Sequence, residues 1–288
     1  MDEPPRFLPP PPLPPPPPPP PPGDSSSGVV GDEAQVPFGW PNHFPPVIDR
    51  PVIRWGMGDV LIGLFLWILG GVVASVIVLS VTDSSPGSGG NLADLGLGAI
   101  VVSLVAGWPG FLGWPIFATW LKGQRSLTKD FGLRIAAVDV GWGVLGGFSA
   151  LFLSVVAGIV WRVLSQSPEP SNAEFLPTSP SAGTAIALLI LVAVCTPIIE
   201  ELFFRGLFLR AVGRRFDLPW AVVASSLVFG LLHFQGSGLH GLFISGVTAT
   251  YGAVFALLVI RSGGRLGPSI VAHMVVNGVG VVAALYLA

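Results

Sequence analysis

The chain has 288 residues, of which 51% are hydrophobic and only 10% are charged. Ordinary soluble domains carry about 25% charged residues, so this composition nearly excludes a soluble enzyme. A formal net charge of −2 excludes a nucleic-acid binder that works by neutralising phosphates, and the single cysteine, Cys195, excludes an internal disulfide or a cysteine-rich metal site.

Residues 1–50 differ from the rest of the chain. Fifteen of the 30 prolines lie in the first 22 residues, and residues 14–22 are all proline. Such a run favours polyproline II over helix or sheet, and the following Gly, Ser and Asp have little to bury. We predict a disordered, proline-rich tail at 1–50. Residues 4–22 are either a ligand for a proline-recognition module or a spacer, and composition alone favours the spacer.

Long uncharged runs follow, separated by short polar breaks. A helix that crosses a bilayer needs about 20 apolar residues. Seven runs qualify: 60–82, 95–121, 140–161, 182–204, 219–236, 241–260 and 267–287. Trp108-Pro109-Gly110 predicts a kink in the second run, and the fifth run is short. We predict an all-α, polytopic membrane bundle of about seven transmembrane helices, with N-terminal transmembrane helices at 55–181 and a C-terminal transmembrane core at 182–288.

Lysine and arginine fall in every second break. The breaks at 122–134, 210–218 and 261–266 are basic, whereas those at 83–94, 162–181 and 234–240 carry at most one cation. Because cytoplasmic loops are enriched in Lys and Arg, this alternation predicts a multi-pass protein of the cell membrane with a cytoplasmic N-terminus. Seven crossings would place the C-terminus outside.

Ionisable residues within apolar spans are costly and mark functional sites by default. Three spans near the C-terminus carry them, in the segments Glu200-Glu201-Leu202-Phe203-Phe204-Arg205, Phe229-Gly230-Leu231-Leu232-His233 and His273-Met274-Val275-Val276-Asn277. At a rise of 1.5 Å per residue, Glu200, His233, His273 and Asn277 lie about 9 to 21 Å below the basic side. We therefore expect them to meet at one level inside the bilayer.

The spacing suggests a role for each group. Glu201 and Arg205 are four residues apart, which favours a structural ion pair. Glu200 has no intrahelical partner, which favours a catalytic role. Two histidines at matching depth also favour a catalytic role. Asn277 fits a catalytic role and a hydrogen bond between helices equally well. Phe229 packs beside His233. Pro197 removes a backbone donor, which frees the carbonyl of Ala193 and predicts a kink.

These residues resemble the three motifs of the CPBP family (CAAX protease and bacteriocin-processing, also called ABI), whose pattern is EExxxR, FxxxH and HxxxN in that order. The resemblance covers about residues 182–280 and implies an intramembrane endopeptidase acting on a membrane-associated, CAAX-like or other peptide. It implies that Glu200, assisted by His233, activates water and that His273 and Asn277 stabilise the oxyanion. Glu201 and Arg205 would hold the site together, and no cofactor is favoured.

Three alternatives stay open at this point. Glu200, His233 and His273 form a conceivable zinc set, although the sequence lacks HExxH. A non-catalytic bacteriocin-immunity or scaffold protein would not need Glu200. A transporter with a proton relay is disfavoured, because transporters commonly show two related halves and only one polar cluster is visible here.

Overall fold

The structure is a computed structural model that describes residues 53–82, 96–171, 173, 175–177 and 179–286. The predicted tail at 1–50, including the proline-rich segment 4–22, lies outside the described residues.

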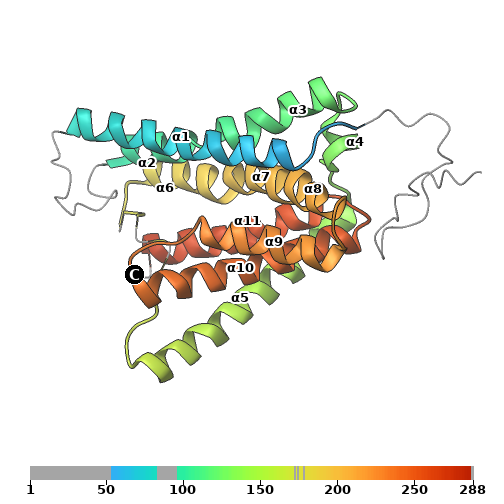
Figure 1. Ribbon diagram of the computed structural model, residues 1–288. Coiled ribbons are helices and arrows are strands. Elements are labelled where there is room, and N and C mark those ends of the chain that lie inside the picture. The colour runs from blue at the N-terminus through green and yellow to red at the C-terminus, as the bar shows by residue number, and fades with distance from the viewer. Residues whose placement is uncertain (1–52, 83–95, 172, 174, 178, 287–288) are drawn as a thin grey trace, which may run out of the picture. The chain divides into compact units, whose positions relative to one another are not determined.

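Every regular element among the described residues is a helix, as predicted (Figure 1). Three of the elements, η3, η4 and η5, are short π-helical segments. In chain order the elements are α1 (Met57–Thr82), α2 (Gly96–Val105), η3 (Pro109–Gly113), α3 (Trp114–Lys122), α4 (Leu127–Phe131), α5 (Ala137–Ser165), α6 (Ala182–Leu188), η4 (Leu189–Cys195), α7 (Thr196–Glu201), η5 (Leu202–Phe208), α8 (Leu209–Gly213), α9 (Leu218–Leu231), α10 (Gly238–Arg261) and α11 (Gly267–Tyr286).

Six helical stretches in the described part of the chain are long and apolar enough to cross a membrane: Met57–Val81, Gly96–Lys122, Ala137–Ser165, Ala182–Gly213, Gly238–Arg261 and Gly267–Tyr286. They match six of the seven predicted spans. The predicted span at 219–236 is only partly helical, because α9 has 14 residues and ends at Leu231. Its length of about 21 Å falls short of the roughly 30 Å hydrocarbon core.

The end of α9 has a local cause. The backbone N–H of His233 bonds to the carbonyl of Gly230, three residues back, which leaves the carbonyl of Phe229 without its usual helical donor. The imidazole Nδ1 of His233 takes that place at 2.8 Å. His233 therefore lies just beyond the helix and caps it, whereas the sequence placed it within a span.

The three basic breaks converge at one end of the bundle. The backbone N–H of Arg54 bonds to the carbonyl of Lys122, and that of Gly267 bonds to the carbonyl of Arg134. The Arg210 side chain donates to the carbonyl of Gly264 at 2.6 Å, and Arg214 donates to that of Trp55 at 3.0 Å. The three breaks that are basic in the sequence thus lie together in space.

Helix α11 positions the later part of the chain around the candidate site. It packs against α5, against α10, and against η4 and α7. Figure 1 shows α11 running alongside the α6–α8 stretch, with α5 and α10 on its other side. A core of aromatic rings joins α1 and η3 to η5 and α9, with Phe111 stacked on Phe203 and Phe204 edge-on to Phe229.

Helix α1 approaches the second span so closely that glycine is needed at the contact. A Cβ atom on Gly70 would lie 1.8 Å from the carbonyl oxygen of Ala106, whereas one on the neighbouring Gly71 would meet nothing within 4 Å. We expect Gly70→Ala to lower the free energy of unfolding by about 1–3 kcal/mol, the usual cost of overpacking.

Gly71→Ala is the matched control for Gly70→Ala, since alanine favours a helix by up to about 1 kcal/mol where space allows. We expect it to leave stability unchanged or raise it. Detergent titration of both variants, followed by circular dichroism, measures the difference. Equal effects of the two substitutions would contradict the close α1 contact.

Candidate active site

The two adjacent acids lie on a short α-helical turn between two π-helical segments. Helix α7 holds Glu200 and Glu201, and it is preceded by η4 and followed by η5. Short π-helical insertions are uncommon and are frequent at functional sites. Successive residues of a helical turn point about 100° apart, so the two acids face different surroundings.

Glu201 is the buried anchor of the cluster. Its carboxyl oxygen Oε1 accepts a hydrogen bond from Arg205 Nη1 at 2.9 Å and lies 3.1 Å from Nδ1 of His273. The side chains of Glu201 and Arg205 are both fully shielded from solvent. This confirms the ion pair predicted from their spacing, and it extends that pair to a histidine on α11.

Arg205 is enclosed by helices α9 and α10. Its Nη2 donates to the carbonyl of Gly252 at 2.9 Å, and its guanidinium lies 4.5 Å from the ring centre of Phe229 and 5.4 Å from that of Phe255. A Cβ on Gly252 would lie 3.1 Å from Arg205 Nη2, so a small residue suits this position. Arg205 thereby links three helices through one buried charge.

Glu200 has a different environment from its neighbour. Its Oε2 lies 3.6 Å from Nε2 of His273, and its side chain retains 16% exposure. This oxygen is buried and makes no hydrogen bond within the described residues. Glu200 therefore carries a buried oxygen with no hydrogen bond among the described residues on a side chain that is still partly exposed.

His273 lies between the two acids. Its ring stacks on Phe255 with centroids 4.9 Å apart and meets Phe229 edge-on at 5.7 Å. Because the Glu201 carboxylate accepts, Nδ1 of His273 is assigned as the protonated nitrogen in the neutral ring, and Nε2 then carries a lone pair toward Glu200. The pair can share one proton between a carboxyl oxygen and an imidazole nitrogen.

His233 joins the cluster through Phe229, whose ring centroid lies 4.9 Å from that of His233. A backbone carbonyl only accepts, so the bond from His233 Nδ1 to Phe229 assigns the proton to Nδ1. Nε2 is then left with a free lone pair. Among the described contacts, the imidazole nearest Glu200 is that of His273, whereas the sequence paired Glu200 with His233.

Asn277 binds the backbone of η4. Its Nδ2 donates to the carbonyl of Val192 at 2.9 Å. The N–H of Thr196 bonds five residues back to Leu191, so the next donor in this register would be residue 197, directed at Val192. Residue 197 is proline, which has no N–H. In this π-helical register Pro197 leaves the carbonyl of Val192 without a backbone donor, whereas the α-helical register assumed from the sequence pointed to that of Ala193.

This contact gives a prediction for stability. We expect Asn277→Ala to cost about 1–3 kcal/mol of unfolding free energy, because the buried carbonyl of Val192 loses its donor. In a Pro197→Ala background the new N–H can serve that carbonyl, so the same substitution should cost less. A double-mutant cycle by detergent titration measures the coupling between the two positions. Additive effects would contradict this account of Asn277.

The zinc alternative does not match this geometry. No three His, Cys, Asp or Glu side chains among residues 53–82, 96–171, 173, 175–177 and 179–286 are grouped so that they could hold one metal ion. Nδ1 of His273 already faces Glu201, and Nδ1 of His233 caps α9.

The structure thus brings together five of the predicted residues: Glu200, Glu201, Arg205, Phe229 and His273. His233 joins them through its contact with the ring of Phe229. Two contributors on α10 were missed, Phe255 beneath His273 and the carbonyl of Gly252. The middle of α10 has no Asp, Glu, His, Lys or Arg, so its only signal was its glycines.

The described residues define a polytopic helical membrane protein with a buried cluster of acids, an arginine and imidazoles. Residues 182–279 match the family model described as Type II CAAX prenyl endopeptidase Rce1-like. The chain is also 30% identical over 138 residues to the "Putative membrane peptidase YdiL" of Bacillus subtilis (strain 168). Residues 182–279, which carry all three motifs, are thus similar to this endopeptidase family.

The similarity to the Bacillus protein covers 47% of this chain and 52% of that protein. The chain thus matches about half the length of this curated relative. No solved structure gives a significant match to the chain.

Proposed function

We propose that this protein is an intramembrane endopeptidase that hydrolyses a peptide bond of a membrane-associated substrate. The observation that carries the proposal is the buried Oε2 of Glu200, which makes no hydrogen bond among the described residues and lies 3.6 Å from Nε2 of His273, on the turn that bears the first motif. A carboxylate removed from bulk water and placed beside an imidazole is suited to accept and relay protons.

In the proposed reaction Glu200 takes a proton from water, with His233 assisting, and the resulting hydroxide attacks the peptide carbonyl. The negative charge that develops on the carbonyl oxygen needs positioned donors. His273 can donate from Nε2 once it has received a proton from Glu200, and Asn277 has a second amide N–H beyond the one bound to Val192. The proton finally passes to the leaving amine, which balances the hydrolysis.

Glu201 and Arg205 are proposed to act by positioning. Glu201 orients His273 through Nδ1, and Arg205 compensates the charge of Glu201. Such support matters because catalytic groups must be held to within a fraction of an ångström. Neither residue needs to contact the substrate in this scheme.

The substrate class follows the description of the matched family. We propose a peptide carrying a prenylated C-terminus as the first candidate and another membrane-associated peptide as the second. We further propose that the basic end of the bundle faces the cytoplasm and that the C-terminus lies outside, since Lys and Arg concentrate on the cytoplasmic side of multi-pass proteins.

Purified protein in liposomes provides the test. A farnesylated fluorogenic peptide and its unmodified twin are offered to the wild type and to Glu200→Ala. Cleavage of either by the wild type alone supports the peptidase, and preference for the farnesylated peptide supports the first candidate. If neither is cleaved, proteomics of membranes with each form identifies an uncleaved peptide. Identical membrane proteomes and no cleavage would overturn the proposal.

The same preparation tests metal dependence. We expect a strong chelator such as 1,10-phenanthroline to change the cleavage rate by less than about twofold, since no metal-binding group of three side chains is found among the described residues. A non-chelating phenanthroline isomer is the control. Loss of cleavage that added zinc restores would instead support the zinc-dependent mechanism with Glu200, His233 and His273.

A further inference from the structure

A cavity separate from the acid–imidazole cluster lies at the basic end of the bundle. It has a volume of about 330 Å³ and is lined by α5, by α10 with the turn that follows it, and by the first turn of α11. Its polar lining comes from Arg261, Ser262 and Arg265, and its apolar lining includes Trp142 and Leu258. A space with this combination of arginines and apolar groups suits an amphiphilic ligand that carries negative charge.

The two arginines of the cavity differ in how their charge is compensated. Arg265 forms a close ion pair with Asp139, with Nη2 2.6 Å from Oδ1 and Nε 3.1 Å from each carboxyl oxygen. Arg261 is exposed and pairs with no carboxylate within the described residues; its guanidinium lies 4.7 Å from the ring centre of Trp142. The cavity therefore keeps an excess positive charge at Arg261.

The cavity lies at the expected depth of a lipid headgroup. Arg261 is the last residue of one candidate span and Gly267 the first residue of the next. Trp142 lies in the second turn of α5 and is 41% exposed, as is typical of the tryptophans that gather at the membrane interface. Val138, on the rim, is 57% exposed, which leaves an apolar approach from the bilayer side.

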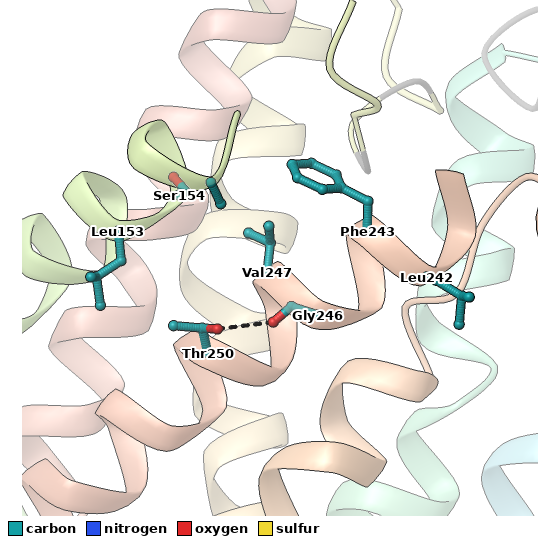
Figure 2. A pocket seen from close by; sticks show the side chains of 8 residues that line it. Leu153, Ser154, Leu242, Phe243, Gly246, Val247 and Thr250 are labelled. Carbon is teal, nitrogen blue, oxygen red and sulfur yellow. Dashed lines mark hydrogen bonds between the residues drawn. The ribbon is translucent and has the colours of Figure 1, made fainter. Parts of the chain in front are cut away.

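Further along the same pair of helices lies a second cavity, of about 210 Å³ (Figure 2). Leu153 and Ser154 of α5 face Phe243, Val247 and Thr250 of α10 across it. The Thr250 hydroxyl is already bonded to the carbonyl of Gly246, so the lining is apolar in effect. Trp142 and Leu153 are separated by 11 positions in the sequence, about 16 Å of helix, which is within the reach of an acyl chain.

We propose that the Arg261 cavity binds the phosphate of an anionic membrane phospholipid whose acyl chain extends along α5 and α10 toward the second cavity. Basic pockets between transmembrane helices are suited to such headgroups. A free phosphate would use the arginines but not Trp142, Leu258 or the apolar cavity beyond them. The proposal concerns a site apart from Glu200 and does not depend on peptidase activity.

Native mass spectrometry of the full chain tests the proposal. The protein is taken from nanodiscs that contain phosphatidylglycerol and phosphatidylcholine, and the bound lipids are counted. We expect the wild type to retain phosphatidylglycerol, with Arg261→Gln weakening its binding about fivefold or more, since one basic group is lost. Arg261→Lys should retain most of the binding.

Arg125→Gln is the matched control, because Arg125 is also exposed, lies 5.7 Å from the ring of Trp120, and is outside the cavity. Equal loss of phosphatidylglycerol in both glutamine variants would overturn the proposal. So would equal retention of the two lipids by the wild type. Thermal stabilisation by inorganic phosphate as large as that by phosphatidylglycerol would show a free-anion site and overturn the lipid assignment.

Discussion

Glu200→Gln should reduce peptide-bond hydrolysis by about 10²–10⁴-fold, the usual contribution of a positioned general base. Glutamine keeps the shape of the side chain, but its amide cannot take a proton from water. The exchange should not destabilise the fold, because the replaced oxygen Oε2 makes no hydrogen bond among the described residues. Initial rates of peptide cleavage in liposomes, beside detergent titration of the same variant, measure both effects.

Glu201→Gln is the matched control one residue away. It removes a fully buried charge that pairs with Arg205 and faces His273, so it should lower stability as well as activity. The proposal thus predicts a separation: activity alone is lost at position 200, and activity and stability are lost together at position 201. Full cleavage by Glu200→Gln would contradict its role as the base.

The same pair of variants addresses the non-enzymatic alternative. An immunity or scaffold protein would keep its cellular phenotype in Glu200→Gln at an unchanged protein level, because that oxygen makes no hydrogen bond among the described residues. A peptidase would lose the phenotype at the same protein level.

Much of the membrane architecture could be predicted because hydrophobic length is a strong signal. Six of seven apolar runs proved long enough as helices, and the basic breaks proved to share one end. The exception, 219–236, shows the limit of that signal. Composition does not reveal that His233 caps α9 with its own side chain, since this depends on a backbone N–H bonding three residues back instead of four.

The candidate site could be predicted in its members better than in its contacts. Glu201 and Arg205 pair as their spacing indicates, since a neighbouring turn brings them together whatever the tertiary fold. The partner of Glu200 comes from another helix, and the rotation of that helix about its axis decides which of its side chains meets Glu200. The nearest described imidazole is that of His273. The presence of Pro197 predicted that one backbone carbonyl would lack its helical donor. It did not predict the π-helical register, in which that carbonyl belongs to Val192.

The largest loss of stability is expected from Arg205→Ala. This guanidinium compensates Glu201 and also donates to the carbonyl of Gly252, and both side chains of the pair are fully buried. Removing one partner of a buried pair leaves the other charge uncompensated, which costs about 3–5 kcal/mol. The loss also opens a gap between Phe229 and Phe255, so the effect should exceed that of any exposed arginine.

Arg162→Ala is the control that separates burial from pairing as such. Arg162 and Glu169 form an ion pair of 3.2 Å, but their side chains are 62% and 46% exposed. Pairs of this kind contribute about 0–1 kcal/mol, because water already solvates both charges. Detergent titration of both variants should therefore show a large shift for Arg205→Ala and little for Arg162→Ala. Similar shifts would mean that Arg205 does not carry the packing of α9 and α10 around Glu201.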